Sequence, residues 1–251
     1  MSLTGLALCS RYSYPPNSLS LCGPDKKSDL NWYSENQKTD RGTLEILSQF
    51  STLYPYLTLI ASENKIKDPF EKSVVEAYWV GNKLLHQIPI TSFISHLSDK
   101  IRMKAKIQKK DFYKIFDKIT EGALPHHSFH VLNVYKRTGH LDILHTVETM
   151  DACLINWGKV KRINNDSLVI ETKPIALINN KLEFGKLRER TVIPQGEKDI
   201  LFKNLKIGDW ISYHWGYFCQ KLTMSQLRNL IFYTDLSIKH ANGNEQKFPI
   251  R

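Results

Sequence analysis

The sequence has no stretch that approaches the roughly 18–20 consecutive apolar residues of a membrane-spanning helix. The mildly apolar N-terminus has no basic residues ahead of it and is interrupted at Arg11, which is atypical of a signal peptide. There are only four cysteines and no C-x-x-C pair, so a disulfide framework is not expected. We therefore expect a cytoplasmic protein without membrane association.

Several common enzyme motifs are also absent. The chain has no G-x-x-x-x-G-K-[ST], no G-x-G-x-x-G after a strand, no H-E-x-x-H and no G-x-S-x-G. The 12 glycines are too scattered to form a phosphate-binding loop. These absences argue against the usual nucleotide-binding, zinc-protease and α/β-hydrolase sites.

The charge is unbalanced toward basic residues. The chain has 35 Lys and Arg against 25 Asp and Glu, a net charge of +10, and 41% of its 251 residues are hydrophobic. That hydrophobic share is enough for the core of one large domain or two small ones. The basic balance permits nucleic acid, an anionic membrane or an acidic protein as partner and selects none of them. Acidic residues spread through 151–251 argue mildly against nucleic acid.

The N-terminal half is predicted to be helical. Turn-forming residues dominate up to about position 40, including an aromatic and proline-rich loop over 10–25. Apolar residues then recur at helical spacing over 43–119, with a helix expected to begin at Asp68, followed by proline at its first position. We assign residues 1–124 to an all-α domain.

Histidines crowd the segment that follows, residues 125–150, which we assign as a connector that ends in a short helix over 141–150. Five of the nine histidines fall within twenty residues there. His126, His127 and His130 have spacings at which two imidazoles can reach one metal ion. No carboxylate stands at a matching offset, so surface or helix-capping histidines are the alternative.

Short alternating segments separated by turn residues dominate the remainder, 151–251. Strands are expected at 153–163, 168–172, 175–178, 181–184 and 210–214, before a final helix over 223–239 capped by Thr223. Closely spaced short strands of this kind usually close into a barrel. The predicted fold class is α+β: an all-α N-terminal domain, then a small OB-like β-barrel with a C-terminal helix.

Two segments of this region carry a resemblance to a known family. Residues 153–160 read CLINWGKV, and residues 208–222 read GDWISYHWGYFCQKL, directly before the final helix. Both are similar, in order and internal spacing, to the HypC/HupF family of [NiFe]-hydrogenase maturation chaperones. The resemblance covers about 151–242.

The resemblance implies a metallochaperone rather than an enzyme. In the family, a cysteine binds iron with its cyanide and carbonyl ligands, Fe(CN)2CO, and carries it from the partner HypD to the precursor of the hydrogenase large subunit. This role falls on Cys153, with His214 at the motif histidine. A thiolate beside an imidazole suits a transferable iron site, and another transition metal remains an alternative.

A further cluster of candidate residues lies in the N-terminal domain. The segments around 10–25 and 75–82 resemble an uncharacterised bacterial family found in hydrogenase-bearing organisms, which implies no activity. Polar residues among aromatic ones suggest a cofactor-binding pocket lined by Arg11, Glu76, Tyr78 and Asn82. Structural hydrogen bonding is the alternative for these four.

Two functions of other classes stay open. The helical domain and the histidines would form the site of a metal-dependent enzyme if they converged in one pocket. A basic nucleic-acid-binding barrel would need exposed aromatic residues on the face of its sheet.

Overall fold

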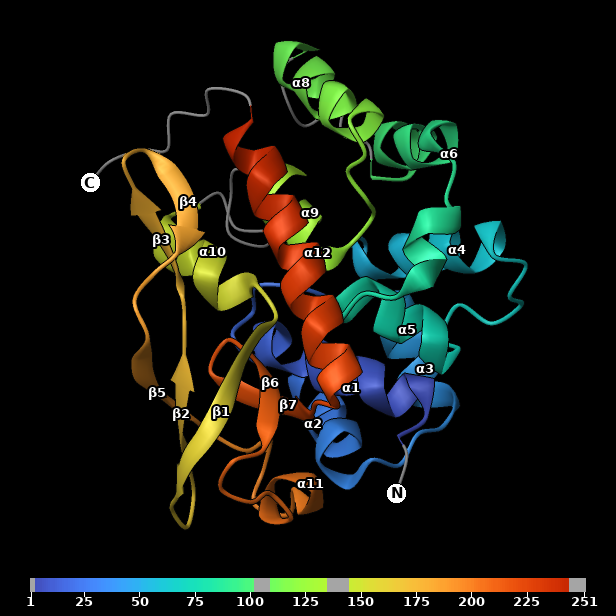
Figure 1. Cartoon of the computed structure of the whole chain (residues 1–251). Helices are drawn as coiled ribbons and strands as arrows, with labels where there is room; N and C mark the ends of the chain where they lie inside the picture. Colours follow the sequence, from blue (N-terminus) through green and yellow to red (C-terminus); the bar gives the residue numbers. More distant parts are fainter. Residues whose placement is uncertain (1–2, 102–108, 135–144, 244–251) are drawn as a thin grey trace.

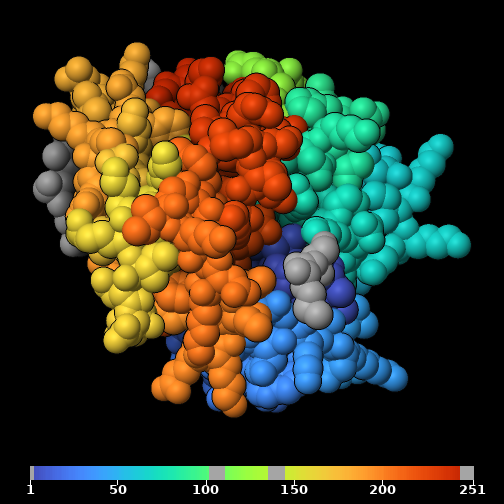
Figure 2. Space-filling view, turned by 60° about the horizontal axis from the view of Figure 1, so that its bottom comes forward, coloured from blue at the N-terminus to red at the C-terminus, as the bar shows by residue number. Residues whose placement is uncertain are grey.

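The computed structural model describes residues 3–101, 109–134 and 145–243. Helices form the N-terminal half, an antiparallel sheet follows, and the long helix α12 (Met224–Asn242) lies between them (Figure 1). Figure 2 shows the red surface of α12 between the yellow and orange strands and the teal helices. The α+β fold class is thereby confirmed.

The first helix, α1 (Gly5–Ser18), covers most of the segment for which the sequence predicts a loop. Pro15 and Pro16 lie in its last turn and have no N–H to donate to the carbonyls four residues earlier. Those carbonyls belong to Arg11 and Tyr12, and side chains from the C-terminal half donate to them instead. The loop prediction was wrong over 10–18, where tertiary contacts supply the hydrogen bonds that the prolines cannot, and was right over 19–25, which lie between α1 and α2.

The helical period expected over 43–119 is confirmed in the described residues. The elements after α1 are α2 (Lys27–Asn36), α3 (Arg41–Ser48), α4 (Leu53–Glu63), α5 (Lys72–Trp79), the 3-10 helix η1 (Lys83–Gln87), α6 (Ile90–Ser95), the π-helical turn η2 (His96–Lys100) and α8 (Lys109–Thr120). Helix α5 begins later than predicted, with Glu71 as its N-cap. Asp68 instead accepts a hydrogen bond from the Phe70 backbone N–H at 2.9 Å, which makes a turn ahead of the helix.

The connector contains three short helical pieces: α9 (His127–Phe129), the π-helical turn η3 (His130–Val134) and α10 (Val147–Cys153). The helix expected over 141–150 lies partly outside the described residues, and its described part begins at Val147. Cys153 was predicted to open a strand, whereas it is the last residue of α10 and the first strand starts at Asn156. The Leu154 backbone N–H donates to the Met150 carbonyl at 2.9 Å, so the last turn of α10 includes Cys153.

The sheet is antiparallel and open. Its order is β5-β2-β1-β6-β7, and β3 pairs only with β4 in a separate hairpin. The strands are β1 (Asn156–Ile163), β2 (Leu168–Thr172), β3 (Ile175–Ile178), β4 (Lys181–Phe184), β5 (Arg188–Val192), β6 (Trp210–His214) and β7 (Tyr217–Lys221). The short helix α11 (Ile200–Lys203) lies between β5 and β6.

The predicted closed barrel is wrong. Among the described residues, an isolated β-bridge between Ile193 and Tyr217 is the one backbone pairing between the two edges of the sheet. The edge strands β5 and β7 do not pair along their length, so the five-stranded sheet stays open, and the hairpin of β3 and β4 packs against α10 and α12 instead of extending it.

The largest hydrophobic core contains residues from both halves of the chain. It includes side chains of α1, α4 and α5 together with Ile155, Leu222 and Leu230 from the C-terminal half. The two halves therefore share apolar packing.

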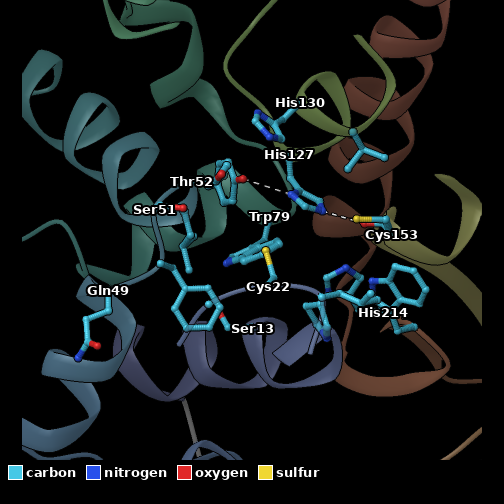
Figure 3. A pocket seen from close by; sticks show the side chains of 18 of the residues that line it. Ser13, Cys22, Gln49, Ser51, Thr52, Trp79, His127, His130, Cys153 and His214 are labelled. Carbon is cyan, nitrogen blue, oxygen red and sulfur yellow. Dashed lines mark hydrogen bonds between the residues drawn. The ribbon is translucent and has the colours of Figure 1, made fainter. Parts of the chain in front are cut away.

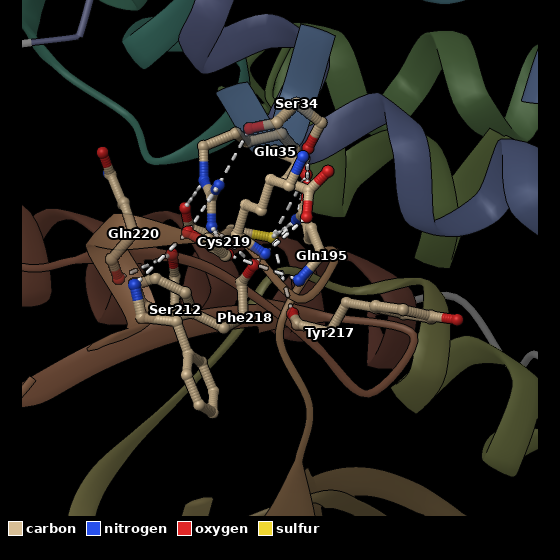
Figure 4. A network of polar contacts seen from close by, with 12 residues as sticks. Ser34, Glu35, Gln195, Ser212, Tyr217, Phe218, Cys219 and Gln220 are labelled. Atoms are coloured by element: carbon tan, nitrogen blue, oxygen red, sulfur yellow. Dashed lines mark hydrogen bonds and ion pairs between the residues drawn. The ribbon is translucent and has the colours of Figure 1, made fainter. Parts of the chain in front are cut away.

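A buried polar network also joins the two halves. Arg11 of α1 pairs with Asp199 at 2.8 Å, and neither side chain is exposed. Its guanidinium also donates to the carbonyls of Ser34 and Cys219 (Figure 4). Gln195 donates to the Arg11 carbonyl and accepts a hydrogen bond from the Ser34 hydroxyl. The network holds α1 and α2 against β7.

Among the described residues, no helix combines the length and apolar composition needed to cross a membrane.

Candidate metal centre

A cavity of about 450 Å³ lies where the N-terminal helices, the connector and the end of β6 meet (Figure 3). Its walls include four histidines and two cysteines: Cys22, His127, His130, His145, Cys153 and His214. None of the described residues that line it is Asp, Glu, Lys or Arg. The cavity therefore presents thiols and imidazoles to a ligand, with no formal charge when these groups are neutral.

Three of these side chains come together as a group that can hold a metal ion. The ligand atoms of His127, Cys153 and His214 all lie within 4.8 Å of one another. They come from the start of α9, the end of α10 and the end of β6. The structure thus unites the pair selected by the HypC resemblance with one histidine of the connector.

The orientation of His214 is set by helix α1. Its Nδ1–H donates to the Tyr12 carbonyl at 2.8 Å, and that carbonyl is available because Pro16 cannot donate to it. With Nδ1 protonated, Nε2 carries the lone pair and is buried without a hydrogen-bond partner among the described residues, because the Cys153 carbonyl beside the ring can only accept a hydrogen bond. A ring N–H bound to a backbone carbonyl with the other nitrogen bare is the usual arrangement of a metal-ligating histidine.

His127 is held at both ring nitrogens. Its Nε2–H donates to the Cys153 carbonyl at 2.8 Å, and its Nδ1 lies 3.2 Å from the Tyr78 hydroxyl. Since a tyrosine hydroxyl can donate or accept, the same contact serves either tautomer of the ring. Tyr78 can therefore orient His127 when Nε2 exchanges the carbonyl for a metal ion.

Burial sets the protonation states of the group. It lowers the pKa of His214 to about 4, with partial compensation from the carbonyls of Tyr12 and Cys153. It also lowers the pKa of His127 well below its usual value, and the proximity of His214 adds to this effect. Burial raises the pKa of the Cys153 thiol to about 12. The imidazoles are therefore neutral and ready to ligate at pH 7, whereas the thiol must lose its proton as the metal binds.

The donor set decides which metals fit. One sulfur and two imidazole nitrogens suit Fe(II), Co(II), Ni(II), Cu or Zn, which accept soft and borderline ligands. The ligand group itself contains no carboxylate, which disfavours Mg²⁺, Ca²⁺ and Mn²⁺ as its metal. The bare Nε2 of His214 is a buried donor that such an ion would satisfy.

The other two predicted metal-ligating histidines have different contacts. His126 is buried with its Nδ1 2.6 Å from the Ser128 hydroxyl, and burial lowers its pKa to about 3. His130 lines the cavity, but its Nδ1 lies 3.1 Å from the Tyr56 hydroxyl, outside the three-ligand group. The H-x-x-H spacing that suggested chelation by His127 and His130 therefore does not describe the group that forms.

Of the four residues proposed to line a cofactor pocket, only Tyr78 lines this cavity. Arg11 is in the buried ion pair, and Glu76 accepts a hydrogen bond from the Gln226 side chain at 3.3 Å. Asn82 caps η1 and donates to the Ser73 carbonyl at 2.8 Å. These contacts give the three residues structural roles.

Sequence reasoning missed the roles of Tyr12 and Pro16. Tyr12 acts through its backbone carbonyl, which leaves no residue-type signal. The adjacent prolines were a visible signal, but they were interpreted as marks of a loop.

The chain belongs to a family of unknown function, DUF6390, whose model matches residues 1–247. No curated protein and no solved structure matches the chain. The family match shows no link to the HypC/HupF family, so that resemblance stays a prediction.

Proposed function

We propose that this protein binds a first-row transition metal through His127, Cys153 and His214 and acts as an assembly factor that passes it on. The observation that carries the proposal is the convergence of His127, Cys153 and His214, whose ligand atoms lie within 4.8 Å of one another, together with the buried Nε2 of His214 that has no hydrogen-bond partner among the described residues. Only one of the three ligands is anionic when bound, so the protein can release the ion more readily than a four-thiolate site would.

Iron is the metal we propose, and [NiFe]-hydrogenase maturation is the process. Support comes from the two residues that the HypC resemblance selects, Cys153 and His214, which lie far apart in sequence and side by side in the metal group. The partners would be a HypD-like maturation protein and the large-subunit precursor, and the cargo iron or the Fe(CN)2CO unit. Four free cysteines are consistent with work in a reducing cytoplasm.

The test is metal analysis with infrared spectroscopy on protein purified anaerobically with its native partners. We expect iron with cyanide and carbonyl bands in the wild type and loss of both in Cys153→Ala. Cys9→Ala is the matched control, because Cys9 is buried in α1 and lies outside the cavity lining. Iron that persists unchanged in Cys153→Ala would refute the proposal.

A second measurement separates a lost ligand from a lost fold. In the purified apoprotein, His214→Ala should weaken Fe(II) binding by more than the roughly 10–100-fold typical of lost supporting contacts. His126→Ala should leave the affinity near that of the wild type, since His126 is outside the group. Circular dichroism would confirm that both variants are folded.

A metal-dependent enzyme is the second candidate, and the cavity favours it. Catalytic metal sites combine three protein ligands with an open position for water or substrate, and the cavity of about 450 Å³ adjoins the group. Mixing the loaded protein with its partner distinguishes the two functions. Net loss of metal to the partner supports the assembly factor, and metal retained through repeated turnover of a small substrate supports the enzyme.

A further inference from the structure

Helix α12 presents large apolar side chains to solvent. Met224, Ile231 and Phe232 are exposed by 54%, 37% and 53%. Their spacing places them on one side of the helix, opposite the buried Leu227, Leu230 and other core residues. Figure 2 shows the helix at the surface between the sheet and the N-terminal helices. Exposed apolar side chains that gather on one face are typical of a surface that binds another protein.

Charged residues flank Ile231 and Phe232 on the same side of α12. Arg228 stands one turn before this pair and Asp235 one turn after it, at equal distances from the midpoint of the pair. Arg228 is exposed and has no ion pair among the described residues. Asp235 pairs with Lys239 at 2.7 Å, yet 43% of its side chain stays exposed, so its carboxylate can accept a second cation.

This face is complementary to itself under a two-fold rotation. When a second α12 lies antiparallel across the midpoint, Ile231 meets Phe232 of the partner subunit, and Arg228 meets Asp235 of the partner subunit. Met224 and Lys239 are also equally far from the midpoint, so the aliphatic part of the lysine covers the methionine of the other copy. A two-fold axis forms each of these contacts twice.

We propose that α12 is the interface of a homodimer in which two copies of this chain pair antiparallel through the exposed face of residues 224–239. The self-complementary order of the charges favours a second copy over an unrelated partner. The net charge of +10 makes two copies repel at long range, but salt at about 0.15 M screens this repulsion beyond about 8 Å. None of the described residues that line the metal cavity belongs to α12, so the dimer does not depend on the proposed function.

The test is sedimentation equilibrium of the purified, metal-free, full-length protein over a concentration series at about 0.15 M salt. We expect the wild type to approach the mass of a dimer. Arg228→Asp should raise the dissociation constant about 10–30-fold, because two attractive pairs become repulsive. Adding Asp235→Arg should recover most of this loss, since the pairs form again with their charges exchanged. Arg41→Asp makes the same charge change on the exposed start of α3 and is the matched control.

The double variant Arg228→Cys/Asp235→Cys tests the antiparallel register. Two residues seven positions apart on one helix are about 10.5 Å apart, too far for a disulfide within one chain. Oxidation should therefore give a disulfide-linked dimer, with far less from either single variant. A wild type that stays monomeric throughout the series would overturn the inference. So would an Arg228→Asp variant that is folded by circular dichroism and dimerises as well as Arg41→Asp.

Discussion

Replacing Asp199 with alanine tests whether the ion pair with Arg11 holds the two halves of the chain together. Both side chains are fully buried, and the Asp199 carboxylate also accepts the Phe202 N–H as the N-cap of α11. Breaking a buried pair by removing one partner costs about 3–5 kcal/mol, because the remaining charge is left uncompensated. Loss of the helix cap adds about 1 kcal/mol.

The expected loss for Asp199→Ala is therefore about 4–6 kcal/mol, a large part of the roughly 5–15 kcal/mol that stabilises a typical domain. Equilibrium unfolding in urea, followed by circular dichroism, measures it. Asp199→Asn separates the two contributions, since the amide oxygen can still cap α11 while the charge is lost. We expect it to recover only about 1 kcal/mol.

The control is Glu45→Ala, which removes an exposed ion pair with Arg41. Exposed pairs on a helix contribute about 0.3–0.5 kcal/mol, so this variant should be nearly as stable as the wild type. If Asp199→Ala is destabilised no more than Glu45→Ala, the buried pair does not join the two halves and the reasoning is refuted.

Two further predictions concern stability. Burial lowers the pKa of His96 and His145 to about 4 in the folded protein. The unfolded chain therefore binds protons at these residues first, and the free energy of unfolding falls as the pH drops from 6.5 toward 4. Each of these two histidines should account for a loss of about 2 kcal/mol between pH 7 and pH 5 in urea unfolding of the metal-free protein, in addition to the loss from the other buried histidines, and a flat profile there would contradict it. Gly81→Ala places a methyl group in the Tyr233 ring at φ +93 and should cost well over the roughly 1–2 kcal/mol of left-handed strain alone. Gly122→Ala, at φ +98 with no atom near, measures that strain alone, and equal losses in the two variants would disprove the clash.

Local sequence patterns determined much of the fold. The apolar period over 43–119, the positions of β1 to β4 and of β6, and the Thr223 cap of α12 all follow from contacts within a few residues of each other, which sequence spacing records directly. The strands β5 and β7 were not predicted. Which strand edges would pair was not visible. Whether the sheet closes depends on the pairing of its edge strands β5 and β7, and this contact between separate elements leaves no mark in local spacing.

The sequence by itself determined the candidate ligands Cys153 and His214, because both stand in segments with a recognisable pattern, and it marked His127 as one of several histidines. Only the tertiary structure decided which histidine joins them. His127 faces Cys153 while His130 contacts Tyr56, although the two are three residues apart. The choice follows from the packing of distant elements around one cavity. The tautomer of His214 is likewise fixed by α1, where Pro16 leaves the Tyr12 carbonyl free to accept its Nδ1–H. Sequence spacing could not show this, because the hydrogen bond joins residues far apart in the chain.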